Sequence, residues 1–209
     1  MLPDGCADIL LDLGDGSASV VGPMTAPLVV AGDRIPEMLG VRFRPGRAAA
    51  LLRTPLHELT DLRVPLQDVA RFRIETEGTV EERIAALERE LVRRAAEAES
   101  DRRIDAAVAA IVRTGGAMSI DVLAREIGVT RQHLRRAFLT HVGVPPKTFS
   151  RVMRFRRVLD AAGSERRPSW AALAADLGYT DQSHLIAEFR ELAGTTPVPF
   201  FLSDQPGGP

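Results

Sequence analysis

Four polar side chains lie close together on the outward side of a short helical segment in the second half of the chain. They are Arg131, Gln132, Arg135 and Arg136, and the apolar Leu134 stands among them. Arginine and glutamine have forked hydrogen-bonding groups that match the edges of guanine and adenine, and arginine also neutralises phosphate. An isolated arginine on a helix is usually only solvated, so the set is a candidate for nucleic-acid binding only through the elements that hold it.

The segment that carries these residues occurs twice. Residues 128–149 read GVTRQHLRRAFLTHVGVPPKTF, and residues 178–200 read GYTDQSHLIAEFRELAGTTPVPF. The offset is 50 at the glycine that opens each copy and 51 from the leucine onward, so the second copy has one extra residue just after its turn. Two copies of one small module indicate a duplicated structural unit.

Each copy has the spacing of a helix-turn-helix. The alanine, glycine and leucine that define it are Ala124, Gly128 and Leu134 in the first copy and Ala174, Gly178 and Leu185 in the second. A small alanine lets the two helices cross closely, the glycine supplies a left-handed turn, and the leucine holds the second helix on the first. The outward face of that second helix can then enter a major groove.

In the second copy the same face is much less basic. It carries Gln182, Ser183, His184 and Ile186 as candidate contacts, and Ala187 beside them. A lone histidine on such a helix more often takes part in a helix cap or is partly buried than contacts a DNA base. The first copy therefore carries most of the positive charge.

Composition narrows the function classes. Residues 1–100 hold 12 basic and 17 acidic residues, a net of −5, and residues 101–209 hold 15 and 11, a net of +4, so the second half is the one suited to a polyanion. A single cysteine and four scattered histidines offer no clustered metal ligands, so no metal or cofactor is expected, and the lone cysteine favours a reducing cytoplasm. We expect no membrane span, because no apolar run approaches ~20 residues.

The first half is predicted to be a small β-rich domain with covering helices. Short apolar runs between Gly and Pro, namely ADILLDL, SASVVG, APLVVAG and LGVRFRPG, indicate strands, and AAALL, TPLHEL and PLQDVARF indicate short helices. A helix begins at Thr79, whose spacing to Glu82 is that of a capping box. The fold class is therefore α+β, with an all-α second half.

The helix after Thr79 has two interpretations. Its apolar stripe consists of Val80, Ile84, Leu87 and Leu91, and this spacing fits both a helix packed on its own domain and the seam of a short coiled coil. Only about two heptads are present, which favours the first. The second would make the chain a homodimer through those four residues.

Everything beyond residues 95–101 is predicted to be helical. Ile104, Val108 and Ile111 stripe one helix, Ser119 caps the next, and Pro146 to Ala162 form a long central helix that joins the two copies. The predicted domains are residues 1–98, a β-rich regulatory domain ending in a helix, and residues 99–209, two helix-turn-helix subdomains joined by that long helix.

Residues 101–209 resemble the DNA-binding domain of the AraC family of bacterial transcription regulators. The resemblance lies in LAREIGVTRQHLRRAF, GVPPKTFSRVMRFRRV, ALAADLGYTDQSHLIAEF and GTTPVPF. It implies a sequence-specific regulator whose two recognition helices enter successive major-groove segments of double-stranded DNA, with RNA polymerase as a candidate partner. Carried over by motif position, the base-facing residues are Gln132, Arg135 and Arg136, then Gln182, Ser183 and Ile186, whereas Ala187 stands where relatives commonly have arginine.

The first half resembles part of a cupin-like sensor domain found in one branch of that family. LPDGCADILLDL, VVGPMTAP and LGVRFRPGRAAALL carry this resemblance. Such domains usually begin well before a PDGC stretch, so either the sheet is an open remnant or the recorded start lies downstream of the true one. About four strands cannot close a barrel, and no enclosed effector pocket is expected.

Two other functions compete with DNA reading. An enzyme would need a site such as Asp4, Cys6, Asp8, Arg42 and Arg44, yet no nucleophile is paired with a base there, so we expect no catalysis. A co-regulator or interaction module whose second helix-turn-helix no longer touches DNA is the alternative that Ala187 favours. The operator, the effector and the sign of regulation do not follow from the sequence.

Overall fold

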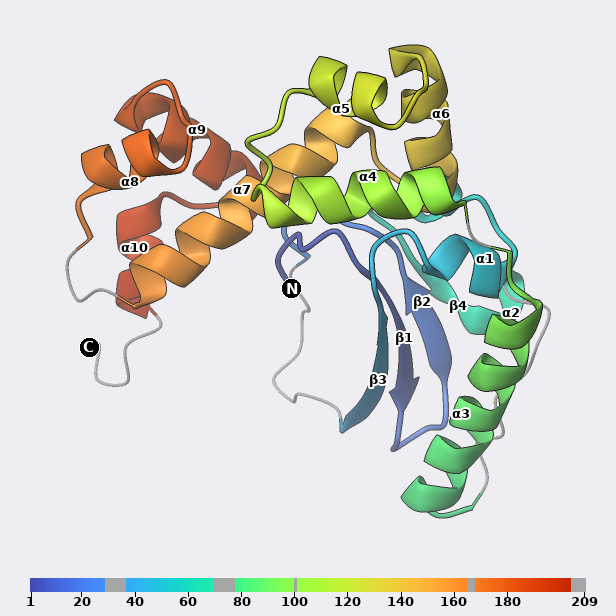
Figure 1. Cartoon of the computed structure of the whole chain (residues 1–209). Coiled ribbons are helices and arrows are strands. Elements are labelled where there is room, and N and C mark those ends of the chain that lie inside the picture. Colours follow the sequence, from blue (N-terminus) through green and yellow to red (C-terminus); the bar gives the residue numbers. More distant parts are fainter. Residues whose placement is uncertain (29–36, 70–77, 100, 165–167, 204–209) are drawn as a thin grey trace.

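The computed structural model describes residues 1–28, 37–69, 78–99, 101–164 and 168–203 (Figure 1). It consists of a small antiparallel sheet with covering helices, followed by an all-helical region. The expected α+β class is thereby confirmed. We refer to the sheet with α1 to α3 as the N-terminal unit and to α4 to α10 as the C-terminal unit.

The sheet has four antiparallel strands in the order β3-β1-β2-β4. Their bounds are β1 Ala7–Asp12, β2 Ala18–Val21, β3 Met38–Phe43 and β4 Arg63–Pro65. In the central strand Ile9 lies opposite Val20 on one side and Val41 on the other, so Ala7, Ile9 and Leu11 line one buried face. That face needs cover from helices.

Three of the four predicted strand segments can be compared with this sheet. ADILLDL, SASVVG and LGVRFRPG form β1, β2 and β3, whereas APLVVAG lies largely outside the described residues. The edge strand β4 was not predicted. With only three residues, β4 is too short to show an alternating apolar pattern. It ends in a proline, which a sheet accommodates only in an edge strand.

Short helices supply the cover. They are α1 Ala48–Leu52, the 3₁₀ turn η1 Leu56–Leu59 and α2 Leu66–Val69. Leu52, Leu56, Leu59 and Leu66 from these helices form one apolar cluster with Ile9 and the neighbouring strands. The N-terminal unit thus has a core of its own.

Helix α3, Val80–Glu97, lies along this unit (Figure 1). The predicted capping box is present, because Thr79 Oγ1 accepts from the Glu82 N–H at 3.3 Å and Glu82 Oε2 accepts from the Thr79 N–H at 2.8 Å. Leu87 is 2% exposed and Leu91 packs against the N-terminal core. Leu87 and Leu91 therefore face their own unit, as the first of the two interpretations predicts, whereas Val80 is 39% exposed.

The C-terminal unit consists of seven helices within the described residues. They are α4 Arg102–Arg113, α5 Ile120–Glu126, α6 Arg131–His141, α7 Pro146–Gly163, α8 Trp170–Asp176, α9 Gln182–Ala193 and α10 Pro197–Ser203. Figure 1 shows α7 running between two helical hairpins, with α5 and α6 at one end and α8 and α9 at the other. The predicted long central helix is confirmed.

The N-terminal unit docks on the loop between α6 and α7. Thr60 Oγ1 donates to the carbonyl oxygen of Gly143 at 2.8 Å. Gly143 has φ +89°, and a Cβ there would lie 2.7 Å from Pro23 Cγ and 3.1 Å from the Leu56 carbonyl oxygen. Only glycine permits both this backbone conformation and this close approach.

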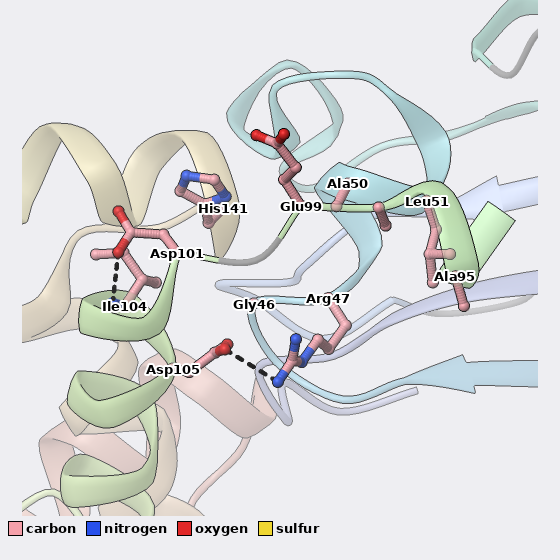
Figure 2. A pocket seen from close by; sticks show the side chains of 11 residues that line it. Gly46, Arg47, Ala50, Leu51, Ala95, Glu99, Asp101, Ile104, Asp105 and His141 are labelled. Carbon is pink, nitrogen blue, oxygen red and sulfur yellow. Dashed lines mark hydrogen bonds and ion pairs between the residues drawn. The ribbon is translucent and has the colours of Figure 1, made fainter.

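A pocket of about 310 Å³ opens where the two units meet (Figure 2). Residues of both units line it, among them Arg47, Leu51, Asp101, Asp105 and His141. It lies outside the sheet, beside the segment that joins α3 to α4, so it is a junction between units and not the interior of a barrel.

Candidate nucleic-acid interface

The first hairpin, α5 and α6, is built as the spacing predicts. Gly128 has φ +70° in the turn, and the Val129 N–H donates to the Ala124 carbonyl oxygen at 3.0 Å. Ala124 and Leu134 are both buried. Thr130 caps α6, because its hydroxyl accepts from the His133 N–H at 3.1 Å. These contacts fix the direction in which α6 presents its outward face.

All four polar candidates on α6 are exposed, namely Arg131, Gln132, Arg135 and Arg136. Arg131 Nη1 lies 3.1 Å from Asp121 Oδ1, but the two side chains are 71% and 57% exposed, so water screens this pair strongly. The helix has three arginines and no acidic residue, a net of +3. Its outward face suits a polyanion.

The second hairpin, α8 and α9, repeats this construction with a longer turn. Gly178 has φ +77°, and the Tyr179 N–H donates to the Ala174 carbonyl oxygen at 2.9 Å. The helix cap is Asp181, which accepts from the His184 N–H at 2.8 Å. This cap is the third residue after Gly178, whereas Thr130 is the second after its glycine. The extra residue of the second copy therefore lies between the turn glycine and the helix cap, where the sequence predicts it, just after the turn.

The candidates on α9 do not all point outward. Gln182 and Ser183 are exposed, but Ile186 is half-buried and packs against the core of the C-terminal unit. His184 is engaged with its own turn, since Nδ1 lies 3.3 Å from both the backbone nitrogen and the hydroxyl of Thr180. Its ring also contacts that of Tyr179, with the centroids 5.3 Å apart. With one arginine and two glutamates, α9 has a net charge of −1.

An open cleft lies between the two hairpins, and α6 and α9 both border it. Arg131 at the start of α6, His184 and Ala187 on α9, and Lys147 at the start of α7 all line it. The amino-terminal ends of α6 and α9 therefore lie on the same side of the C-terminal unit.

One hydrophobic core joins the two hairpins to α7. The rings of Phe138 on α6 and Phe149 on α7 are 6.0 Å apart, and those of Phe155 on α7 and Phe189 on α9 are 5.2 Å apart. All four side chains are almost fully buried. Each hairpin thus packs on its own half of α7.

The sequence did not reveal a buried ionic group that also joins α9 to α7. Glu188 is 4% exposed and accepts from Arg151 Nε at 2.8 Å and from Arg154 Nη2 at 3.2 Å. The Arg154 guanidinium lies 4.7 Å from the centre of the Tyr179 ring. Burial and the Glu188 charge raise the pKa of Tyr179 well above its ordinary range. The only feature of the sequence that could have indicated this group is the position of Glu188, which is next to Phe189 in the apolar pattern of α9.

Three of the five residues considered for catalysis, Asp4, Asp8 and Arg42, form an ion-pair group, and Arg44 is exposed. Arg42 Nε binds Asp8 at 2.9 Å, and its Nη1 binds Asp4 at 2.9 Å. Burial, together with the negative charge of Asp4, raises the pKa of Cys6 to about 12. The thiol therefore keeps its proton at neutral pH and is a poor nucleophile.

The family match agrees with this geometry. Residues 123–201 match the family described as helix-turn-helix domain, and residues 1–65 match a domain of unknown function, DUF6597. Two crystal structures of ToxT from Vibrio cholerae are similar in shape. The apo K231A variant is 13% identical with a TM-score of 0.46, and the match covers 96% of this chain and 86% of ToxT. The structure in the P21 crystal form is 12% identical with a TM-score of 0.47, and the match covers 96% of this chain and 90% of ToxT. No curated protein matches the sequence.

The fold and the match together define a helix-turn-helix protein. More narrowly, residues 123–201 of the C-terminal unit match a helix-turn-helix domain, the kind of DNA-binding domain found in transcription regulators. None of the helices in the described part of the chain has the length and apolar character that crossing a bilayer requires.

Proposed function

We propose that this chain is a sequence-specific, non-enzymatic transcription regulator that inserts α6 and α9 into successive major-groove segments on one face of duplex DNA. The observation that carries the proposal is the pair of hairpins whose recognition helices border one cleft, with the exposed Arg135, Arg136 and Gln132 on the first of them. Forked donors of this kind read base edges in the major groove. Such a regulator acts in the cytoplasm.

The length of α7 supports the spacing of the two contacts. Its 18 residues span about 27 Å at the rise of an α-helix. The hairpins lie at its two ends (Figure 1), and successive major-groove faces on one side of DNA lie about 34 Å apart. One bridging helix of this length therefore suits two adjacent groove segments.

We assign direct base contacts to Gln132, Arg135, Arg136, Gln182 and Ser183. Arg131 and His184 lie at the border of the cleft, where phosphate contacts are the better fit, and Ile186 acts through packing because it is half-buried. We further propose that residues 1–98 and 99–209 are separate domains, which two distinct apolar clusters support. In this proposal residues 1–98 position the DNA-binding residues 99–209. The regulator would also contact RNA polymerase.

A second candidate function is a co-regulator that reads DNA with α6 alone. It is favoured by the net charge of −1 on α9 and by the exposed, uncharged Ala187. Gln182→Ala separates the two functions, because a second hairpin that no longer touches DNA would leave the affinity unchanged. If α9 reads bases, we expect a loss of about 1 to 3 kcal/mol in binding free energy.

The decisive experiment selects duplexes from a random pool with the full chain and then measures Kd and a footprint on the selected site. We expect Arg135→Ala to weaken binding by about 1 to 3 kcal/mol and to relax selection at one base position. Arg89→Ala is the matched control, because Arg89 is exposed on α3 of the N-terminal unit. Equal affinity for selected and random duplex, or a footprint limited to one groove segment, contradicts the proposal.

A further inference from the structure

Glu188 occupies a position that an apolar residue would normally fill. It lies on α9 next to the buried Phe189 and Leu185, on the side of the helix that faces α7. In the first hairpin the corresponding residue, 51 positions earlier, is Ala137, which packs against the core. The carboxylate is therefore a specific feature of the second hairpin.

Two arginines from successive turns of α7 hold this carboxylate. Arg151 Nε donates to one oxygen at 2.8 Å, and Arg154 donates to the other from Nε at 3.3 Å and from Nη2 at 3.2 Å. Arg151 also bonds Glu191, one turn further along α9. Contacts at two successive turns of each helix restrain both the distance and the rotation of α9 relative to α7.

The turn of the second hairpin belongs to the same group. Tyr179 follows the turn glycine, and its ring stacks under the Arg154 guanidinium at 4.7 Å. Arg154 thus contacts the turn and α9 at once, with its side chain only 16% exposed. The whole second hairpin is tied to α7 through this group.

A group of this kind contributes more to geometry than to stability. Removing charges from water offsets much of the attraction between them, so a buried ion pair adds little net stability, whereas breaking it leaves a buried charge without a partner. Hydrogen bonds to forked guanidinium groups are directional. Apolar contacts such as those of Ala137 tolerate small shifts more readily.

We propose that Glu188 is a positioning residue, which binds Arg151 and Arg154, fixes α9 on α7, and so sets the base-pair spacing between the two groove segments that the chain reads. This inference rests on the proposed function. The first hairpin has a different support, since the N-terminal unit contacts the loop after α6 through Thr60. The spacing of the two recognition helices therefore depends on how firmly the second one is held.

The test uses the full chain and a DNA duplex that the wild-type chain has selected. In two further duplexes, the distance between the two groove segments that the chain reads is lengthened or shortened by one base pair. One base pair rotates the second segment by about 34° around the DNA axis. We expect the wild-type chain to lose about tenfold or more in affinity on either altered duplex. Glu188→Gln keeps the shape of the side chain and removes its charge. The loss of affinity that this variant shows on the altered duplexes should be only about threefold or less.

Asp176→Asn is the matched control, because Asp176 is an exposed carboxylate on α8 of the same hairpin and lies outside the group formed by Glu188, Arg151 and Arg154, so it should keep the wild-type spacing preference. If Glu188→Gln proves unfolded by circular dichroism, Arg154→Lys gives the same readout with the charge retained and the fork lost. A folded Glu188→Gln or Arg154→Lys chain with the wild-type spacing penalty overturns the positioning role alone. A wild-type chain that selects no sequence at all overturns the proposed function itself.

Discussion

Arg47 at the start of α1 and Asp105 on α4 form an ion pair across the junction of the two units, with Nη2 and Oδ2 3.0 Å apart. Figure 2 shows this pair at the border of the junction pocket. The side chains are 49% and 27% exposed. Because water screens pairs of that exposure, the contact marks the junction without dominating its free energy.

The first prediction concerns this pair. A double-mutant cycle of Arg47→Ala and Asp105→Ala should give a coupling free energy of about 0.2 to 1 kcal/mol in thermal or urea unfolding. The coupling should shrink in 1 M salt. A coupling above about 3 kcal/mol would show that the pair is desolvated far more than its exposure indicates.

The second prediction compares two glycines in the same backbone region. Gly143→Ala should destabilise the chain by about 2 to 4 kcal/mol, because strain at φ +89° adds to contacts with Pro23 and the Leu56 carbonyl. Gly128→Ala is the control, since a Cβ there meets nothing within 4 Å and only the strain of φ +70° remains, about 1 kcal/mol. Urea unfolding of both variants measures the difference, and equal losses would refute the docking contact.

The third prediction adds the charge that α9 lacks. Ala187→Arg places a cation in the cleft between the hairpins, so DNA affinity should rise and the slope of log K against log salt should steepen by about 1. Ala109→Arg, at an exposed site on α4, adds the same charge elsewhere and serves as the control. An unchanged slope for Ala187→Arg would mean that α9 does not approach the phosphates.

The fourth prediction separates packing from pairing on α3. Leu87→Glu should unfold or strongly destabilise the N-terminal unit, by about 3 kcal/mol or more, because it puts a charge at a site that is 2% exposed. Val92→Glu on the same helix, at a site that is 69% exposed, should leave the melting temperature nearly unchanged. Sedimentation of the wild-type chain and of both variants tests the coiled-coil interpretation of α3. A dimeric wild-type chain and a well-folded, monomeric Leu87→Glu chain would support that interpretation.

The fifth prediction concerns the thiol of Cys6. Its native pKa of about 12 lies above the ordinary 9.0, so the native state binds more protons between these values, and stability should fall as pH rises from 9 to 12. Alkylation by iodoacetamide at pH 8 should therefore be more than about tenfold slower in the native chain than in urea. Equal rates would contradict the burial of this thiol.

The helical half could be predicted in detail because its signals are local. The turn glycines, the cap at Ser119 and the buried leucines each depend on residues within a few positions, as does the cap at Thr79 in the N-terminal unit. The predicted exposure of the candidate residues was correct where exposure follows helical periodicity, as for Arg135. Ile186 is half-buried because the packing of α9 on the core shifts the boundary of the buried face, which periodicity alone does not define.

The Glu188 group could not be predicted for a physical reason. A glutamate in an amphipathic helix usually lies in water, and its partners Arg151 and Arg154 are 37 and 34 residues away in the chain. Nothing local shows that three charged side chains converge. The strand β4 is similar, because its pairing with β2 is a tertiary contact that compensates for its short length.

The contact between Thr60 and Gly143 also orders events during synthesis of the protein. The two residues are 83 positions apart, and a ribosome that adds roughly 5 to 20 residues per second needs about 4 to 17 s to reach the second after the first. During that interval the surface around Leu56 and Thr60 has no covering loop. The nascent N-terminal unit is therefore exposed to chaperones and to aggregation until the first hairpin has emerged, and slowing translation before residue 143 should lengthen that exposure.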